Sequence, residues 1–414
     1  MKRLRIATVF TELGIGGDEN RALSFAQHVD RSRFEHVVVT IVQADADTEH
    51  KVGPMQARYR EAGIECISMG ERRRSDCRRL PQPLSAVRDG GRTLRIATRL
   101  ARLFTRERID VVDARMTYNM VVGLMAARMA NVPVAIATEY YVDWWSGAPW
   151  RWIAPTIFDG YDAIITDSSW ALAQYRRDLR RPLEHGVVIR NGIPQPSSTL
   201  TRCEVRRRLG IPEAAPVVGQ IARVIHYKGQ LQLLRAAAEV HRRRPDVWFL
   251  ICGYSASDPE FANSLEREVE TLAIGHRVCM TPWPGPIGDI WQAVDIHAHP
   301  SLLDSSPIAI HESMALGLPA VVSSAGGIPE LVEHEVTGLV VPVNDTSALS
   351  GSIVRLLDEP ATRARLGAAA RSRYAERHRP EQMTSAIEAL ISDLHARKQS
   401  ASAQLEAPLV AAGG

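Results

Sequence analysis

Short apolar runs alternate with helical patterns along most of the chain, and this alternation constrains the fold more than any other feature. In the first half the runs include LRIATVF, HVVVTIV, DVVDAR and VPVAIAT, with helical patterns near 92–107 and 121–130 between them. Runs that are apolar throughout, rather than at every second residue, are typical of parallel strands buried on both faces and joined by crossover helices. The first half therefore predicts a doubly wound α/β sheet.

The same rhythm restarts after residues 192–202, a segment rich in Pro, Ser and Thr. Further helical patterns then alternate with the apolar runs APVVGQIARV, DVWFLICG, DIHAHPS and PAVVSS. A chain of 414 residues is long enough for two cores. We therefore expect a first domain at 1–197, a second domain at 198–380, a last helix at 381–398 and a disordered tail at 399–414.

Composition narrows the classes of function. The 50 Lys and Arg residues nearly balance 47 Asp and Glu residues, so charge gives no case for a nucleic-acid partner. Five cysteines without CxxC or Cys/His ligand spacing favour a reducing, cytoplasmic location over a disulfide framework or a zinc site. The N-terminal apolar run is too short for a signal peptide. The stretch 120–137 is interrupted by Arg128, Asn131 and Pro133, so no transmembrane helix is expected.

The segment SLLDSSPIAIHESMALGLPAVVSSAGGIPELV concentrates charge, proline and glycine at a predicted strand-to-helix edge. Ser305 or Ser306 is expected to cap a helix whose first residue is Pro307. Backbone N–H groups at a helix start, together with the positive end of its dipole, favour a phosphate. Asp304 before the helix and Glu312 inside it could bind different hydroxyl groups. Ordinary capping by the carboxylate is an alternative of equal weight.

Two cations lie on the loop IARVIHYKG, between a buried strand and a helix. From this loop, Arg223 and Lys228 could together neutralise a diphosphate without a metal ion. For an isolated pair, solvated surface charge is the more common outcome. The neighbouring acids make the diphosphate clamp the preferred interpretation.

Taken together, these segments resemble the retaining glycosyltransferases of family 4, whose GT-B fold consists of two facing Rossmann-like domains with a cleft between them. The resemblance rests on LGIGGDENRAL, VVIRNGI, IARVIHYKG, the block at 299–332 and TGLVVP followed by Asp345. The order and spacing of these five pieces are far more specific than any one of them. The resemblance implies transfer of a hexose from a nucleoside diphosphate sugar, most simply a UDP-sugar, to a hydroxyl acceptor. Retention of configuration and independence of metals or cofactors follow from the same resemblance.

The resemblance also implies roles for single residues. The family's two glutamates, seven residues apart, correspond to Asp304 and Glu312, which would bind the donor sugar and the ribose hydroxyls. Asp304 is one methylene shorter than the family's residue, which points to a different donor sugar. The other implied donor-binding residues are Arg223 and Lys228 at the diphosphate, Ser306, Pro307 and Ile308 through their backbone, and Gly16 and Gly17 on the first loop. The first domain would bind the acceptor and the second the nucleotide sugar, with the last helix crossing back to the first domain.

The first domain departs from the family where relatives usually carry a histidine, at the end of VPVAIAT. Here Glu139, Tyr140 and Tyr141 follow that strand, and either Glu139 or Tyr140 takes the histidine position. We assign Glu139 to the donor and the two tyrosines to the acceptor. Arg115 replaces a second family histidine and could face an anionic group of the acceptor. A surface arginine at a strand end is the equal alternative.

Four tryptophans then follow within nine residues, in the sequence EYYVDWWSGAPWRW. Flat aromatic faces suit sugar or aglycone rings, so we assign Trp144 and Trp145 to the acceptor site. A helix packed by its tryptophans has about equal weight, and a membrane-interface anchor has less.

A basic amphipathic helix is predicted before the strand DVVDAR. Its arginines, spaced alternately by four and three residues, are Arg88, Arg92, Arg95, Arg99, Arg102 and Arg106. Weak peripheral contact with the inner membrane face is one interpretation, and a solvated arginine face is the preferred one.

A metal site at two histidines and two alternative functions are also considered. We expect His297 and His299 to point to opposite faces of a strand and not to chelate a metal together. One rival is a nucleotide-sugar epimerase or a phosphorylase on the same scaffold. The other is a non-catalytic partner subunit.

Overall fold

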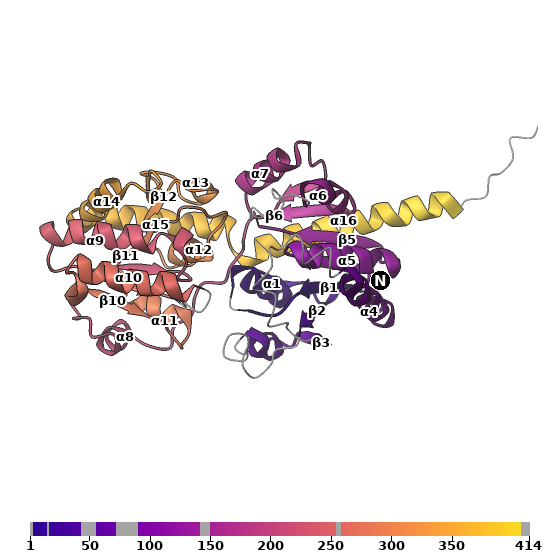
Figure 1. The fold of residues 1–414 in the computed structure, drawn as a ribbon, viewed down its shortest axis with the longest axis horizontal. Coiled ribbons are helices and arrows are strands. Elements are labelled where there is room, and N and C mark those ends of the chain that lie inside the picture. Colours follow the sequence, from indigo (N-terminus) through magenta and orange to yellow (C-terminus); the bar gives the residue numbers. More distant parts are fainter. Residues whose placement is uncertain are drawn as a thin grey trace, which may run out of the picture. The chain divides into compact units, whose positions relative to one another are not determined.

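The computed structural model describes residues 3–14, 16–42, 55–71, 90–140, 150–253 and 258–406. The chain forms two compact units, one from Met1–Gly192 with Pro380–Gly414 and the other from Ile193–Arg379 (Figure 1). Each unit has its own parallel sheet and its own hydrophobic core. The predicted pair of doubly wound α/β domains is confirmed.

The first unit has a seven-stranded sheet in the order β3-β2-β1-β4-β5-β6-β7 across its described residues. All of its pairs are parallel. The central strands β1, β4 and β5 are almost wholly buried, as expected for runs covered by helices on both faces. The strands are β1 (Leu4–Phe10), β2 (Phe34–Val42), β3 (Glu65–Glu71), β4 (Val111–Arg115), β5 (Val134–Thr138), β6 (Ala163–Thr166) and β7 (Gly186–Val188).

The chain order reverses between β3 and β4, so the connections after that point run in the opposite direction across the sheet. Right-handed crossovers then place the helices of the two halves on opposite faces. The named helices of this unit are α1 (Gly17–His28), α4 (Gly90–Arg106), α5 (Thr117–Met129), α6 (Trp150–Asp159), α7 (Ser169–Leu179) and α16 (Pro380–Glu406), and residues 55–61 are helical as well. The last of these, yellow in Figure 1, packs against α1 and β5 through Met383, Ile387 and Ile391.

The second unit has a six-stranded parallel sheet in the order β10-β9-β8-β11-β12-β13 across its described residues. Because β8 and β11 are neighbours, the loops that follow their carboxyl ends meet at one edge of the sheet. The strands are β8 (Val217–Ile221), β9 (Trp248–Cys252), β10 (Val278–Thr281), β11 (Ile296–His299), β12 (Ala320–Ser323) and β13 (Leu339–Val341).

Helices cover the two faces of this second sheet. They are α8 (Arg202–Arg208), α9 (Gln230–Arg243), α10 (Pro259–Thr271), α11 (Ile287–Gln292), α12 (Ile308–Ala315), α13 (Ile328–Leu331), α14 (Thr346–Asp358) and α15 (Pro360–Arg377), with short 3-10 turns η2 (His226–Lys228) and η3 (Gly275–Arg277). The core lies between α9, α14 and the central strands, where Leu233, Phe249 and Ile353 are buried.

The element bounds differ from the predicted ones mainly at the C-terminus. The last helix begins at Pro380 and continues to Glu406, past its predicted end at residue 398. The first part of the predicted disordered tail is therefore helical. A sequence predicts a helix end reliably only where the capping signal is strong, and none occurs near residue 398. Ser400 lies within the helix, where its hydroxyl donates to the carbonyl of Ala396. The compact units divide after Gly192, whereas the predicted boundary follows residue 197.

Candidate functional site

The second unit brings Lys228 and Asp304 together at the carboxyl edge of its sheet. Lys228 ends the turn after β8, and Asp304 lies on the loop between β11 and α12. The ammonium of Lys228 lies 2.5 Å from Asp304 Oδ2, and the two side chains are 13% and 12% exposed. A basic residue and an acid that the sequence assigns to one ligand therefore form a largely buried ion pair with each other.

The same carboxylate oxygen accepts further hydrogen bonds. His299 Nε2 lies 3.2 Å from Asp304 Oδ2, and the hydroxyl of Ser301 donates to it over 3.3 Å. Burial alone would raise the pKa of the Asp304 carboxyl, but Lys228 and His299 together hold it well below its usual range. Asp304 is therefore an anion over the physiological pH range.

The prediction that His297 and His299 face opposite sides of their strand is wrong. Residues two apart on a strand lie on the same face, and the two rings are 5.4 Å apart between centroids. Both rings are buried, and burial lowers the pKa of each, so both are neutral near pH 7. His297 Nδ1 shares a hydrogen bond with the Ser313 hydroxyl at 2.8 Å.

Two glycines allow the backbone to approach closely around this pair. Gly229 has φ of +75°, and a Cβ there would lie 2.0 Å from the carbonyl oxygen of Pro300. Gly326 has φ of +57°, and a Cβ there would overlap the carbonyl oxygen of Asp304, to which Gly327 donates its N–H over 2.9 Å. The glycine pair that follows β12 therefore supports the loop that carries Asp304.

Glu312 lies inside α12 and is half-buried. Its Oε2 accepts a hydrogen bond from Trp291 Nε1 over 2.9 Å. The Trp291 ring in turn packs edge to face on His297, with centroids 5.0 Å apart. One chain of contacts thus connects Glu312, through Trp291 and the two histidines, to Asp304.

Arg223 contributes differently from Lys228. Its side chain is exposed and donates to the hydroxyl of Tyr227 over 3.2 Å. Its backbone is held by Gln230, whose amide donates to the Arg223 carbonyl over 2.8 Å. Arg223 is therefore an accessible cation on a well-anchored loop.

The start of α12 lies one residue later than predicted. The helix begins at Ile308, Pro307 is the capping residue, and no side chain caps the helix. The expectation that Ser305 or Ser306 caps it is therefore wrong. Proline supplies no N–H, so the amide donors at this helix start begin with Ile308.

The glycines of the first loop lie at the start of α1 in the first unit. Gly16 is the capping residue in an extended conformation, and Gly17 is the first helical residue. Glu19 accepts the N–H of Gly14 over 3.1 Å and closes this loop. A Cβ on Gly16 would meet the Glu19 carboxylate, which would have to move to admit a side chain here.

Arg115 is fully buried, so the alternative of a surface arginine at a strand end is wrong. Its Nε donates to Asp113 over 2.8 Å and its Nη1 donates to Asp18 over 2.5 Å. Burial opposes its charge, but the two carboxylates raise the pKa of Arg115 well above its usual value. Its positive charge is already neutralised inside the protein.

Tyr140 joins the same cluster. Its hydroxyl donates to Asp18 over 2.8 Å and receives a hydrogen bond from Arg21 over 3.2 Å. Arg21 also donates to the carbonyl of Ile189 over 2.8 Å. Burial raises the pKa of Tyr140, so its hydroxyl remains protonated.

Glu139, directly after β5, is 1% exposed. Its Oε2 has no hydrogen-bond partner among the described residues. Burial, with Asp18 as a second cause, raises the pKa of Glu139 well above its ordinary value. Burial therefore favours the protonated form of Glu139. Tyr141, Trp144 and Trp145 lie outside the described residues.

Sequence reasoning missed three participants, Asp18, Arg21 and Trp291, and considered His299 only as a metal ligand. Asp18 and Arg21 follow the glycine pair in GGDENR. Asp18 could have been found from the sequence, because an acid after β1 and Arg115 at the end of the neighbouring strand β4 indicate an ion pair. Trp291 and His299 give no comparable signal, since buried Trp and His are common in any core.

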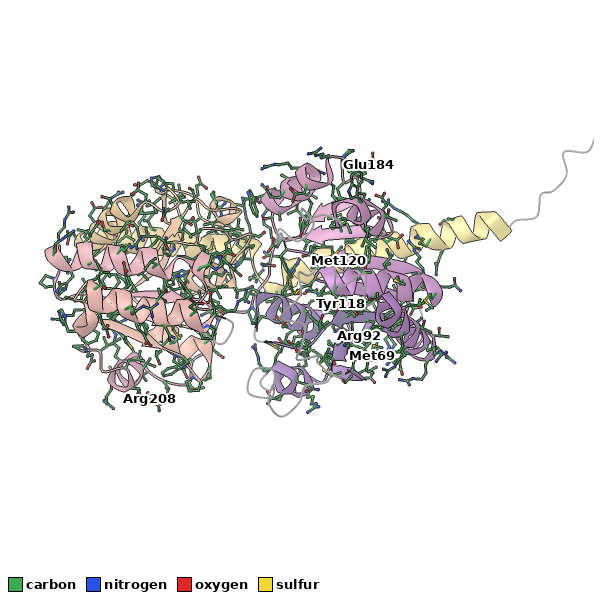
Figure 2. The ribbon with its side chains drawn as sticks, in the orientation of Figure 1. Met69, Arg92, Tyr118, Met120, Glu184 and Arg208 are labelled. Atoms are coloured by element: carbon green, nitrogen blue, oxygen red, sulfur yellow. The ribbon has the colours of Figure 1, made fainter. Side chains whose placement is uncertain are left out.

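Two arginines of the basic helix α4 pair with an acid on a neighbouring strand, and Arg88 lies outside the described residues. Arg95 and Arg99 both contact Glu71, and Arg99 donates to the carbonyl of Met69 over 2.7 Å. Met69 on β3 and Arg92 near the start of α4 are labelled in Figure 2. These contacts favour the solvated face over a lipid contact. None of the helices in the described part of the chain is both long and apolar enough to cross a bilayer.

Family models match both units. Residues 16–192 match the glycosyl transferase 4-like domain, and residues 201–373 match glycosyl transferases group 1. A D-inositol 3-phosphate glycosyltransferase of Corynebacterium aurimucosum is 32% identical over 52% of this chain. An alpha-maltose-1-phosphate synthase of Mycobacterium tuberculosis is 28% identical over 64% of it. The chain spans 53% and 73% of the lengths of these two relatives.

Solved structures extend the likeness to nearly the whole chain. Anabaena HepE in complex with UDP-glucose has a TM-score of 0.77 at 19% identity and covers 94% of this chain and 100% of its own. Sucrose-phosphate synthase from Thermosynechococcus elongatus has the same TM-score and identity and covers 95% of this chain and 100% of its own. The first unit therefore matches the glycosyl transferase 4-like domain and the second matches glycosyl transferases group 1, and the two Rossmann-like units have the GT-B fold.

Proposed function

We propose that this protein is a retaining glycosyltransferase that moves a hexose-type sugar from a nucleoside diphosphate sugar to a hydroxyl acceptor. The observation that carries the proposal is the grouping of Lys228, Asp304 and Glu312 at one sheet edge of the second unit. Loops at the carboxyl ends of open α/β sheets are where such folds bind ligands. The first unit would bind the acceptor and the second the donor.

In the proposed mechanism the second unit stabilises the leaving diphosphate. Negative charge grows on the diphosphate as the anomeric bond breaks, and Arg223, Lys228 and the amides from Ile308 onward would stabilise it. The departing phosphate oxygen would take the acceptor proton. Glu312, oriented by Trp291, would hold the ribose hydroxyls. No metal or cofactor is assigned a role.

The first unit favours an acceptor whose reacting end is uncharged. Arg115, the cation expected to meet an anionic group, is already paired with Asp18 and Asp113. Glu139, which we assign to the donor, adds no anion-binding group, because it is a buried acid whose pKa is raised. We therefore favour a hydroxyl of a glycan, a glycolipid or a small natural product over a phosphorylated one.

A UDP-sugar is the preferred donor in this proposal. Anabaena HepE, whose solved complex holds UDP-glucose, supports it through the fold only. A Corynebacterium glutamicum relative that is 30% identical over 43% of this chain is named as GDP-mannose-dependent. GDP-mannose is therefore the second donor to test.

Nucleotide release separates the proposal from its rivals. The purified protein is incubated with UDP-glucose or GDP-mannose, with and without a panel of hydroxyl acceptors and with a chelator. We expect release that depends on the acceptor, continues with the chelator and yields a product of retained anomeric configuration by NMR. Conversion of the nucleotide sugar without any acceptor would indicate an epimerase, and a need for free phosphate would indicate a phosphorylase. No turnover of a bound donor with any acceptor would favour a non-catalytic subunit.

A cytoplasmic location belongs to the same proposal, with the arginine face of α4 solvated in preference to weak peripheral contact with a membrane. Flotation with vesicles that contain anionic lipid tests the contact. Loss of co-flotation on Arg102→Glu supports it, and absence of any co-flotation overturns it.

A further inference from the structure

Lys228 cannot bind a diphosphate and keep its ion pair with Asp304 at the same time. As a clamp residue it must meet a diphosphate, yet in this structure its ammonium lies 2.5 Å from Asp304. Its backbone is fixed, because Gln220 donates to the Lys228 carbonyl over 2.6 Å and Gly229 occupies a left-handed conformation next to it. Only the side chain of Lys228 is therefore available to change partner.

A buried carboxylate that loses its cation is strongly disfavoured. Removing one partner of a buried ion pair is strongly destabilising, because it leaves an uncompensated buried charge. If Lys228 turns toward a ligand, the Asp304 carboxylate keeps, among the described residues, only His299 and Ser301 as hydrogen-bond partners. A replacement positive charge next to Asp304 would remove most of this penalty.

His299 is placed to supply that charge. Its Nε2 already contacts the oxygen of Asp304 that Lys228 occupies, at 3.2 Å. Its ring is 1% exposed, and its Nδ1 has no hydrogen-bond partner among the described residues. The titratable or charged groups that face the ring are Asp304, Lys228 and the neutral His297. With Lys228 beside it the ring is neutral, and Asp304 is the one group near it that favours its charged form.

We propose that His299 takes up a proton from solvent when Lys228 leaves Asp304 for a bound anionic ligand, so that His299 acts as a positioning residue for the exchange. The inference rests on the proposed function, since it takes the ligand to be the diphosphate of a nucleotide sugar. The lysine stays an ammonium throughout, and the proton gained by the imidazole is the whole change in the protein's charge. An imidazolium then holds Asp304 in place while Lys228 holds the ligand.

If binding is coupled to proton uptake, the direction in which ligand affinity changes with pH is fixed. A group that binds a proton more tightly in the complex makes binding tighter as the pH falls. Between the pKa of His299 in the free protein and its higher pKa in the complex, affinity should rise up to about tenfold for each unit of lower pH. Nucleotide sugars are suitable probes, because a diphosphate esterified at both ends does not itself titrate near neutral pH.

A ligand-free experiment tests the charge exchange first. Lys228→Met imitates withdrawal of the lysine, and NMR of protein labelled only at histidine reports the protonation of each ring. The resonance that disappears in His299→Asn is assigned to His299. We expect an imidazolium at pH 6.5–7.5 in Lys228→Met, where the wild type has a neutral ring. A neutral ring in Lys228→Met across that range overturns the proposal. Lys228→Gln serves as a second variant if Lys228→Met folds poorly.

Calorimetry then tests the coupling to binding. UDP-glucose and GDP-mannose are titrated at one pH into the wild type in buffers of different ionisation enthalpy. We expect uptake of up to one proton per ligand in the wild type and in the exposed-histidine control His276→Asn, and none in His299→Asn. Uptake unchanged in His299→Asn, or binding to the wild type without uptake, overturns the proposal. If neither nucleotide sugar binds, the donor assignment fails, and the NMR result alone decides the proton exchange.

Discussion

Lys228→Ala and Arg223→Ala should separate stability from catalysis. We assign both side chains to the same diphosphate, so either change is expected to lower turnover by about 10²- to 10³-fold. Their surroundings differ, because Lys228 belongs to a largely buried pair whereas Arg223 is exposed and contacts Tyr227. Only the lysine variant should therefore unfold more easily.

The magnitude follows from what each change leaves behind. Loss of Lys228 leaves Asp304 as a buried carboxylate with two hydrogen bonds, which places the loss at the lower end of the usual range, about 3 kcal/mol. For a unit of this size, 1 kcal/mol corresponds to about 2–4 °C, so the melting temperature should fall by about 6–12 °C. Arg223→Ala should change the free energy of unfolding by less than about 0.5 kcal/mol.

The assay combines thermal unfolding of the ligand-free protein with initial rates of nucleotide release. Unfolding is measured well above the pH range in which His299 is expected to be charged, so that His299 gives Asp304 no compensating charge. The double variant Lys228→Ala/Asp304→Ala is the matched control, and it should recover most of the lost stability because no buried charge remains unpaired.

Two results would refute this reasoning. Equal melting temperatures for the two single variants would show that the pair between Lys228 and Asp304 does not stabilise the unit. Turnover within tenfold of the wild type for either variant would remove that residue from the clamp.

Three further predictions follow from particular contacts. Gly229→Ala should destabilise the protein by clearly more than the control Gly210→Ala in urea unfolding, because both have positive φ but only Gly229 faces a backbone oxygen, and equal losses would contradict this. Glu139→Gln should stabilise the protein increasingly above pH 4.5, by up to about 1.4 kcal/mol per pH unit. The pKa of Glu139 is higher in the folded protein than in the unfolded chain, so the stability of the wild type falls as the pH rises above the unfolded pKa. A stability difference between variant and wild type that stays constant from pH 4 to pH 7 would exclude a neutral Glu139. Trp291→Phe should weaken nucleotide binding about tenfold by calorimetry, because Glu312 loses its indole donor, and unchanged affinity would separate Glu312 from the nucleotide.

The strands and helices were largely predictable because the signals that specify them are local. A run such as LRIATVF is apolar at nearly every residue, which requires a strand covered on both faces wherever it lies in the sheet. Capping signals were less reliable. The start of α12 moved from Pro307 to Ile308, and α16 continued to Glu406 through residues without a strong stop signal.

Partners of charged residues were not predictable in the same way. Arg115 looks like an accessible cation until Asp18, 97 residues away, is placed beside it by the start of α1. Lys228 and Asp304 are 76 residues apart and meet because β8 and β11 are neighbours in the sheet. A charged residue that looks accessible in the sequence can therefore be buried and paired in the fold, because the order of the strands in the sheet brings its partner next to it.

The sequence by itself therefore determined the two doubly wound sheets, the family and the residue types available at the sheet edges. Only the tertiary structure decided which of those residues are already neutralised by a neighbour, as Arg115 is, and which remain accessible, as Arg223 is. The physical reason is that hydrophobic periodicity is a property of adjacent residues. Charge pairing and burial depend on distances between segments that lie far apart in the chain.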